Sequence, residues 1–439
     1  MKRIVTFVLV AFLISSFAFA GGQKEESSAD GRMVLTMTSS YTKEESATDN
    51  TRKMPRDTIL EYAENNADTL DLQITEFQHN DYETVIQARA AANDLADVFI
   101  MKGSWVKNFY DSGLIADLTG YVEECPWLDE YRDGLFFPAT VDGKIMATPM
   151  QFSTTSIVFY NKDLWAKAGY DEFPSTWEEV FAAIPKFEEM GVYPIAFGNR
   201  DKWQFNSSWI STLGPRFCGE DWVDSIIEGS EDVAFTDPEF TKLLEFVVQL
   251  GQSGLFNPDY SVVDNQNASS LFLQGKAATT IDGYWNVEYM ASSATPEVLE
   301  NIGFAYMPTI EGGIGDPTSA SSGCGWFCGV NSSLTGERLA KAAELALYIS
   351  GPALSQRMTD VGLVSTCNTP PSEGVEFDTL HTNYLAFVDN ATSTVPIWDA
   401  NMNASLIAVM NDQFVELLAG RTTPEAAAEI IQAEYEATR

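Results

Sequence analysis

The chain is poor in the residues that most metal and nucleophilic centres require. It has two histidines in 439 residues, His79 and His381, which leaves little material for a histidine-based metal site or a catalytic triad. Of five cysteines, Cys324 and Cys328 stand close together, without redox-motif spacing and without a second pair for zinc. A disulfide between them is compatible with export, although an odd count leaves at least one thiol unpaired. The sequence therefore indicates no cofactor and no metal site.

Basic residues are also scarce, with 26 lysines and arginines against 63 acids and a net charge of −37. A chain this acidic does not bind nucleic acid or an anionic membrane surface through electrostatic attraction. The net charge is weaker evidence against small anionic ligands, because the electrostatic potential inside one pocket can differ from the average over the protein. Acidity of this degree is equally compatible with a role in solubility alone.

Long apolar runs are missing beyond the first residues. Lys2 and Arg3 precede an apolar run from Ile4 to Ile14, and Ala18-Phe-Ala20 forms a small-x-small cleavage site. Eleven apolar residues are too few to span a bilayer, which takes about twenty. We therefore predict that residues 1–20 are a signal peptide cleaved after Ala20, and that the mature protein is soluble and periplasmic or extracellular. The polar stretch 21–32 is typical of a flexible tether.

What remains alternates between strand-like and helix-like segments, the pattern of an α/β protein. The mature chain opens as strand, helix, strand, helix and strand. A later capping box, Ser175-Thr-Trp-Glu178, predicts a helix start with Ser175 as the cap. The five opening elements are predicted at 33–39, 55–66, 70–77, 81–93 and 96–101.

The segment 271–286 (LFLQGKAATTIDGYWN) is the most informative in the chain. It predicts the end of a helix, a Gly-Lys stop, an apolar strand, and a sharp turn at Asp282-Gly283 that presents Trp285 at the strand's exit. Ligands of open α/β sheets bind beyond the carboxyl ends of the strands. A tryptophan there offers a flat apolar face and one donor to a small molecule. The alternative is that Trp285 is an ordinary core aromatic. Asp282 is expected to stabilise its own turn rather than to contact the ligand.

Five sequence motifs occur in one order over nearly the whole mature chain. Together they resemble extracellular solute-binding proteins of ABC transporters, specifically the sugar-binding class (family 1, maltose-binding-protein-like). The contact pattern of maltodextrin binders is not reproduced around residues 101–104, so that specificity is not implied. The motifs are ADVF at 96–99 with SGLIADL at 112–118, DGKIMATP at 142–149, FYNKDL at 159–164 with PSTWEE at 174–179, the segment 271–286, and LAGRTTPEAA at 418–427.

The resemblance implies the two-lobed periplasmic-binding-protein fold (type II-like). Each lobe would be a mixed sheet flanked by helices, with the ligand held between them. Lobe one would hold 33–150 and 310–366, and lobe two 156–306 and 370–439. The hinge crossovers would lie near 150–155, 307–311 and 365–371.

A sugar presents apolar faces and a rim of hydroxyls, so its site needs aromatic plates and a few fixed polar groups. The resemblance places Trp285, Trp326, Trp203 and Trp398 at the ligand, although each could instead be core packing. Gly325 would allow close approach of the backbone. Lys102 could bind a hydroxyl or a carboxylate, or be solvated. The polar candidates at strand exits are Ser40, Tyr41, Lys102, Ser104, Gln151 and Thr154.

The resemblance implies a non-catalytic, monomeric binding component of an ABC importer. It would capture a saccharide or sugar derivative by hinge closure and deliver it to the permease subunits in the membrane. Two alternatives remain open at this point. One is a binding protein for a cationic or peptide-like solute, and the other is a secreted carbohydrate-active enzyme, which would need only two suitably placed carboxylates.

Overall fold

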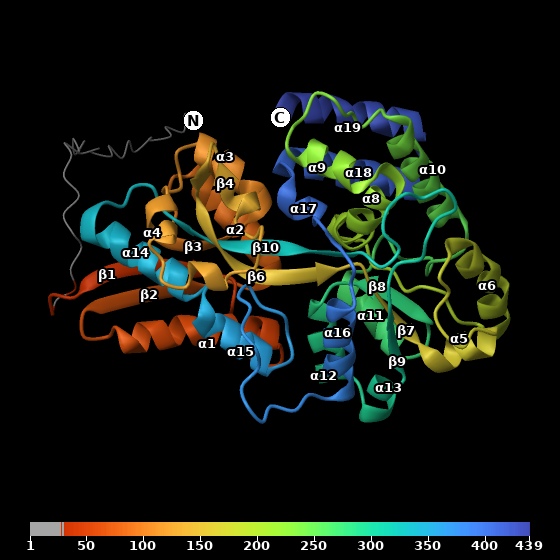
Figure 1. Cartoon of the computed structure of the whole chain (residues 1–439), viewed down its shortest axis with the longest axis horizontal. Coiled ribbons are helices and arrows are strands. Elements are labelled where there is room, and N and C mark those ends of the chain that lie inside the picture. The colour runs from red at the N-terminus through yellow and green to blue at the C-terminus, as the bar shows by residue number, and fades with distance from the viewer. Residues whose placement is uncertain (1–27, 29) are drawn as a thin grey trace, which may run out of the picture.

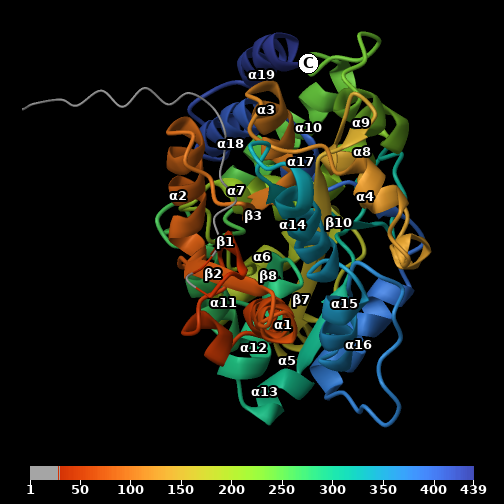
Figure 2. The same cartoon turned by 90° about the vertical axis from the view of Figure 1, so that its left-hand side faces the viewer.

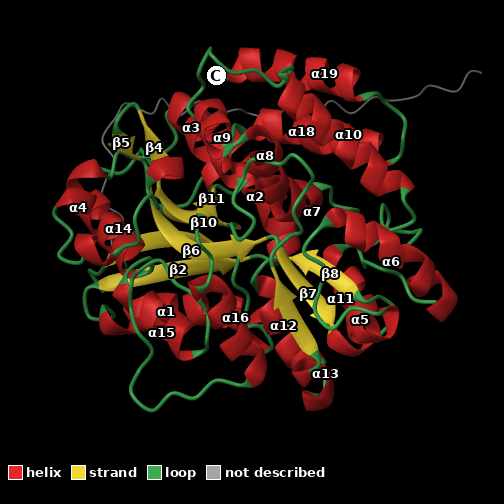
Figure 3. Ribbon diagram, turned by 45° about the vertical axis from the view of Figure 1, so that its right-hand side comes forward, coloured by secondary structure: helices red, strands yellow, loops and turns green. Residues whose placement is uncertain are grey.

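The structure, a computed structural model, describes residue 28 and residues 30–439. The predicted signal peptide, its cleavage after Ala20, and residues 21–27 and 29 of the predicted tether lie outside the described residues. The chain forms two lobes side by side, each built on its own sheet (Figure 1). Figure 3 shows the two sheets as separate groups of strands with helices around each. The expected two-lobed α/β fold is thereby confirmed.

Lobe one is built on a six-stranded mixed sheet with the strand order β11-β10-β3-β1-β2, in which β6 also pairs with β10. Strands β2 and β3 run parallel to β1, whereas β10 runs antiparallel to both β3 and β6. The carboxyl ends of β1, β2 and β3 therefore meet at one edge of the sheet. The strands are β1 (Met33–Ser39), β2 (Leu70–Glu76), β3 (Val98–Lys102), β6 (Ala147–Thr155), β10 (Ala320–Val330) and β11 (Thr394–Val395).

Helices surround this sheet, as Figure 2 shows with lobe one facing the viewer. A small hairpin, β4 (Thr140–Val141) with β5 (Lys144–Ile145), forms around Asp142 and Gly143. The helices of this lobe are α1 (Asn50–Asn65), α2 (His79–Ala91), α3 (Val106–Asp111), α4 (Thr119–Glu123), α14 (Gly336–Tyr348) and α15 (Pro352–Asp360).

The predicted opening β-α-β-α-β is confirmed, but its first helix starts earlier than Pro55. Asp49 caps α1 by accepting from the amide of Thr51 at 2.7 Å, so the helix begins at Asn50. Pro55 then lies inside the helix, where its missing N–H frees the carbonyl of Thr51. The side chain of Gln151 on β6 donates to that carbonyl at 2.8 Å. Proline thus leaves the helix intact because a neighbouring strand supplies the lost donor.

Lobe two is built on a three-stranded antiparallel sheet with the order β8-β7-β9. Its strands are β7 (Ile157–Asn161), β8 (Thr279–Asp282) and β9 (Ile302–Ala305). Its helices are α5 (Lys162–Ala168), α6 (Trp177–Met190), α7 (Trp203–Phe205), α8 (Ser211–Cys218), α9 (Glu220–Ile227), α10 (Pro238–Gln252), α11 (Asn265–Leu273), α12 (Trp285–Ser293), α13 (Pro296–Glu300), α16 (Thr379–Asp389), α17 (Trp398–Asn401), α18 (Ala404–Leu418) and α19 (Pro424–Thr438).

The predicted cap of α6 is displaced by one residue. Thr176, not Ser175, accepts from the helix, through the amide of Glu179 at 3.3 Å. Ser175 and Thr176 both carry a hydroxyl, and glutamates follow each of them at capping-box distance, so the sequence pattern fits either start.

Up to residue 378 the chain passes between the lobes at three places. Strand β6 leads into β7 through Ser156, which has a left-handed φ of 61°. Residues 306–319 connect β9 to β10, and residues 361–378 connect α15 to α16. Strand β11, which follows α16, then returns to pair with the start of β10, a pairing that the expected division at residue 370 did not include.

Arg216 on α8 donates hydrogen bonds to the second of these connections, residues 306–319. It donates to the carbonyls of Met307, Pro308 (2.8 Å) and Pro317 (2.9 Å) and is 2% exposed. Burial lowers the pKa of Arg216 to about 10, a shift that the Asp316 charge opposes. The guanidinium therefore stays charged at neutral pH while its donors hold three carbonyls of the connection.

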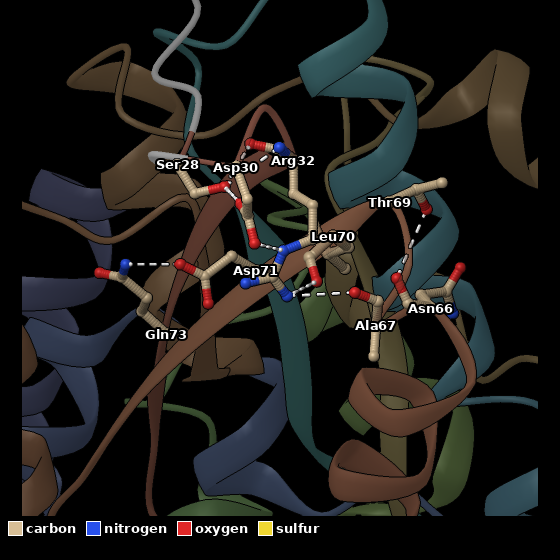
Figure 4. A network of polar contacts seen from close by, with 9 residues as sticks. All are labelled: Ser28, Asp30, Arg32, Asn66, Ala67, Thr69, Leu70, Asp71 and Gln73. Carbon is tan, nitrogen blue, oxygen red and sulfur yellow. Dashed lines mark hydrogen bonds and ion pairs between the residues drawn. The ribbon is translucent and has the colours of Figure 1, made fainter.

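The start of the described chain is anchored to β2 (Figure 4). Arg32 donates to the carbonyls of Ala67 at 3.1 Å and Leu70 at 3.4 Å, and it pairs with Asp30 at 2.8 Å. Ser28 accepts from the amide of Arg32 at 3.0 Å. Residues 28 and 30–32 thus belong to the folded part, whereas the sequence assigned them to the tether.

The five cysteines are buried and free in the part of the chain that the structure describes, so Cys324 and Cys328 do not form a disulfide. Between residues 30 and 439, no helix combines the length and the apolar character that crossing a membrane requires.

A buried histidine links two helices of lobe two beside the contact with α1. The His381 ring lies 2.9 Å from Glu288 on α12 and 2.9 Å from Asp378, which caps α16. The other oxygen of Glu288 accepts from the amide of Asn50 in lobe one at 3.3 Å. Burial alone would lower the pKa of His381, but the bonds to the two carboxylates outweigh it and the net shift is upward.

The raised pKa of His381 predicts a pH-dependent contribution to stability. The stabilisation is fully present below the unfolded-state value of about 6.5 and is lost as pH rises through the raised folded value. The urea midpoint of the wild type should exceed that of His381→Gln most at about pH 6 and less at about pH 9. His79 is common to both proteins and cancels in the difference. A difference that stays constant or grows with pH would contradict this account.

Candidate functional site

An aromatic cluster lies at the carboxyl edge of the lobe-one sheet. The half-buried ring of Trp326 on β10 packs edge-on to Trp105, with centroids 6.1 Å apart. The centroid of His79, at the start of α2, lies 5.1 Å from that of Trp326, and Tyr82 lies 6.4 Å from it. His79 and Tyr82 follow β2, Trp105 follows β3 and Trp326 lies on β10, so the order of these strands in the sheet brings the rings together.

Lys102 ends β3 beside this cluster. Its Nζ lies 5.6 Å from the Trp326 centroid and 5.8 Å from the Trp105 centroid, within the range of cation–π contacts. It also pairs with Glu83 on α2 at 2.7 Å. Burial raises the pKa of Asp399 on α17 of lobe two, and the charge of Lys102 opposes this shift. The two side chains therefore lie near each other across the lobes.

A second aromatic cluster follows β8 in lobe two. Trp285 begins α12 and is half-buried, with its ring edge-on to Trp203 (5.5 Å) and to Tyr284 (5.7 Å). One oxygen of Asp282 accepts from the amide of Gly283 and from Nε1 of Trp285, both at 2.9 Å. Burial raises the pKa of Asp282 to about 7 although these bonds oppose it. The turn carboxylate therefore also fixes the indole.

Gly283 is required beside that ring. A Cβ added there would lie 2.3 Å from an atom of Trp285, closer than side chains approach. Glycine therefore lets the indole lie directly over the turn.

The two clusters border the contact between the lobes. The amide of Tyr284 donates to the carbonyl of Thr154 on β6 at 2.8 Å. Burial raises the pKa of Tyr284, and the charge of Arg52 from α1 of lobe one opposes that shift. A Cβ on Gly103, which follows β3, would lie 2.5 Å from the carbonyl of Ala400 on α17. The backbones of the two lobes therefore approach each other closely beside each of the two aromatic clusters.

Several buried polar atoms in this region have no hydrogen-bond partner among the described residues. Buried polar groups in proteins almost always have one, so these atoms are candidates for contact with a ligand. A molecule rich in hydroxyls could act as donor and acceptor for the whole set. The atoms are the Ser40 and Tyr41 hydroxyls, Nδ1 of His79, Oε1 of Gln204, Oδ1 of Asn206 and Oδ2 of Asp282.

Four predicted residues lie half-buried at this contact, namely Trp285, Trp203, Trp326 and Lys102. Gly325 lies beside Trp326 and has room for a Cβ, whose nearest neighbour would be the Ser153 hydroxyl at 3.7 Å. Ser40 and Tyr41 are buried with unpartnered hydroxyls.

Three others are buried within the fold in this conformation. Gln151 donates to Thr51, as described above, and is buried. Thr154 is buried and its carbonyl holds Tyr284. Ser104 is buried in the turn after β3.

Trp398 does not lie at the site. The structure places its ring in the core of lobe two, 0% exposed, against Phe240 and over Gly214, where a Cβ would meet it at 2.2 Å. The ring has no face open to a ligand. The interpretation of Trp398 as a stacking plate is therefore corrected.

Sequence reasoning missed three residues of the site. His79 and Trp105 follow strands β2 and β3 in the same way as the predicted residues, so the rule of strand exits could have found both. Arg52 was missed because the helix was expected to start at Pro55. The capping sequence Asp49-Asn-Thr was the available signal.

The described residues contain no group of three or more His, Cys, Asp or Glu side chains placed to hold a metal ion. The residues at the lobe contact can stack on a ligand through their aromatic rings, bind its hydroxyl groups, and present a small number of charges.

Comparison with known proteins matches residues 56–325 to the family described as bacterial extracellular solute-binding protein. A probable sugar-binding periplasmic protein of Rhizobium meliloti is 26% identical over 219 residues, covering 48% of this chain and 50% of the relative. The chain thus spans about half the length of that curated relative.

Solved structures match over more of the chain. One, from work on xylan utilization by the thermophilic bacterium Caldanaerobius polysaccharolyticus, is 24% identical with a TM-score of 0.77 and covers 92% of this chain and 100% of its own. A chitin oligosaccharide binding protein is 21% identical with a TM-score of 0.76, and the match covers 93% of this chain and 99% of that protein. At these identities the likeness establishes the shared fold.

Proposed function

Because the chain belongs to the bacterial extracellular solute-binding proteins, we propose that it captures a saccharide between its lobes for an ABC importer. The observation that carries this is the pair of half-buried tryptophan clusters, Trp326 with Trp105 and Trp285 with Trp203, at the contact between the lobes. Tryptophan faces suit the apolar C–H faces of sugar rings, and the unpartnered polar atoms nearby suit the hydroxyl rim. The relatives named for sugar or oligosaccharide binding support the same class.

The proposed mechanism is hinge closure about the three connections between the sheets, near 150–155, 307–311 and 365–371. Lobe one would comprise 33–150 and 310–366, and lobe two 156–306 and 370–439. The change of sheet at Ser156 supports the first crossover. A ligand that touches both lobes stabilises the closed state by its contacts to the second lobe.

The proposal includes a monomeric, non-catalytic protein that presents its closed form to permease subunits. It is exported with residues 1–20 as a signal peptide cleaved after Ala20.

A thermal-shift screen of residues 21–439 tests the proposed function. Mono-, di- and oligosaccharides are compared with amino acids, short peptides and polyamines. A ligand that binds only the folded state stabilises it by about 2.7 kcal/mol at a hundredfold excess over its dissociation constant. We expect a saturable rise in Tm with one set of saccharides. A response confined to peptides or polyamines would contradict the saccharide assignment.

A further inference from the structure

Asp282 is a buried carboxyl group with one oxygen left without a partner. The residue is 0% exposed, and its Oδ1 accepts from the amide of Gly283 and from Nε1 of Trp285, both at 2.9 Å. Its Oδ2 is buried and has no hydrogen-bond partner among the described residues. Buried polar atoms almost always have a partner, so this oxygen requires a donor that the chain does not supply.

No cation of the described residues balances this carboxyl group, since no lysine, arginine or histidine forms an ion pair with Asp282. The charged groups of the neighbouring elements are already paired with one another. These pairs are Arg200 with Asp264 (3.1 Å), Lys202 with Asp412 (2.6 Å) and Glu288 with His381 (2.9 Å). A buried carboxylate is costly unless it is paired and hydrogen-bonded, so Asp282 can still bind a cation from outside the chain.

A second buried acceptor lies beside the same turn. Nε2 of Gln204 on α7 donates to the carbonyl of Ile281, the residue before Asp282, at 3.3 Å. Because a carbonyl oxygen only accepts, the atom of Gln204 that faces it is the amide nitrogen. The amide oxygen of Gln204 is then a free acceptor, and it is buried without a partner in a residue that is 2% exposed.

The other unpartnered groups near the turn are neutral. They are the hydroxyl of Thr280 on β8 and Nδ2 of Asn286 on α12, and neither can balance the charge of an ionised Asp282. Burial raises the pKa of Asp282 to about 7, so its acid and carboxylate forms are both populated at neutral pH. A cation beside this group would lower the pKa and select the carboxylate.

The aromatic cluster of lobe two brings a ligand to these two acceptors. The nitrogen edge of the half-buried Trp285 ring contacts Asp282, and Trp203, which directly precedes Gln204, lies edge-on to the same ring at 5.5 Å. A substituent of a sugar that stacks on Trp285 can therefore reach both acceptors. The face of a tryptophan also attracts ammonium groups, and the net charge of −37 draws cations toward the protein.

We propose that the saccharide bound here is an amino sugar, whose protonated amine pairs with Asp282 and donates to the amide oxygen of Gln204. This inference rests on the proposed function and narrows its ligand class. An ammonium group has three N–H donors and no acceptor, which matches two free acceptors beside an aromatic face. A neutral hydroxyl can donate to one of these oxygens but leaves the carboxylate charge unbalanced.

Calorimetric titration of residues 21–439 tests the proposal with three series of probes. They are glucose, N-acetylglucosamine and glucosamine, each as the monosaccharide and as the cellulose-type dimer and trimer, so they differ only in one substituent. We expect a glucosamine probe to bind about ten-fold or more tighter than its two neutral counterparts at about pH 6 and low salt, because charge-assisted hydrogen bonds are the stronger ones.

A matched pair of variants assigns this preference to one carboxyl group. Asp282→Asn keeps an oxygen for Gly283 and Trp285 but replaces the free oxygen by an amide nitrogen, so the ratio of amine to neutral affinity should fall to near one. The ratio cancels any effect of the substitution on the turn, which both probes share. Asp412→Asn removes an exposed carboxylate that pairs with Lys202, and it should keep the ratio of the wild type.

Proton release gives a readout in the wild type, which holds if Asp282→Asn does not fold. At about pH 5.5 the amine of glucosamine is already protonated, and so is most of Asp282, because its pKa is about 7. Pairing with the amine should release close to one proton per bound probe, which titrations in two buffers of different ionisation enthalpy measure. The glucose series should release far less.

Three results would overturn the inference and leave saccharide binding standing. They are equal affinity for the amine and neutral probes, a preference for the amine that survives Asp282→Asn, and amine binding without proton release. A wild type that binds a neutral saccharide of the thermal-shift screen but no glucosamine probe would overturn it as well. Failure of every saccharide to bind would instead refute the proposed function.

Discussion

Replacing Trp285 by alanine is expected to weaken saccharide binding by about 100-fold. The ring is half-buried, fixed by Asp282 at 2.9 Å and braced by Trp203, so it meets a ligand without losing conformational freedom. Truncating a central aromatic at a binding site costs about 2–3 kcal/mol, which corresponds to about 30- to 160-fold in affinity. Calorimetry with the best saccharide of the screen measures the effect.

Two further variants separate loss of the ring from loss of the fold. Gly283→Ala keeps the indole but puts a Cβ 2.3 Å from it, so it should weaken binding in the same direction by displacing Trp285. Phe137→Ala removes an aromatic that is 52% exposed outside the site and should leave the affinity unchanged. Wild-type affinity in a folded Trp285→Ala protein would remove this residue from the site.

Arg216→Met is expected to lower the free energy of unfolding of lobe two by about 3–5 kcal/mol, because several buried acceptors lose their donors at once. Methionine fills similar volume but leaves the carbonyls of Met307, Pro308 and Pro317 without the donors that Arg216 supplies. An unpaired buried acceptor costs about 1–3 kcal/mol. The urea midpoint, followed by tryptophan fluorescence, reports the change.

The matched control is Arg421→Met, which removes an exposed arginine paired with Glu416 on the surface of the same lobe. Exposed pairs contribute little to stability, so its midpoint should remain near that of the wild type. An equal shift of the urea midpoint in both variants would contradict the stabilising role of Arg216 at the 306–319 connection.

The opening elements were predictable because their signals are local. Alternating apolar residues place β1 at Met33–Ser39, and the Asp282-Gly283 turn after β8 is encoded by its own two residues. The start of α1 was not predictable in the same way. Pro55 is tolerated inside the helix because Gln151, almost a hundred residues later, donates to the carbonyl that proline leaves free.

The position of a site residue was predictable from the sequence where the order of the strands alone determines it. Trp285 and Trp326 follow from their strands, whereas the place of Trp398 depends on Gly214, whose missing side chain opens the core space that the indole fills. The Ser40 and Tyr41 hydroxyls become informative only when burial shows that they lack partners. Such non-local facts are absent from the pattern of any single segment.

The most direct test of the account is a calorimetric titration of the mature protein with the best saccharide, followed by chromatography of the recovered sugar. The account predicts one site per chain, lost affinity in Trp285→Ala and sugar recovered unchanged. Cleaved sugar would identify an enzyme, and binding that is indifferent to Trp285 would place the ligand elsewhere than between the two tryptophan clusters.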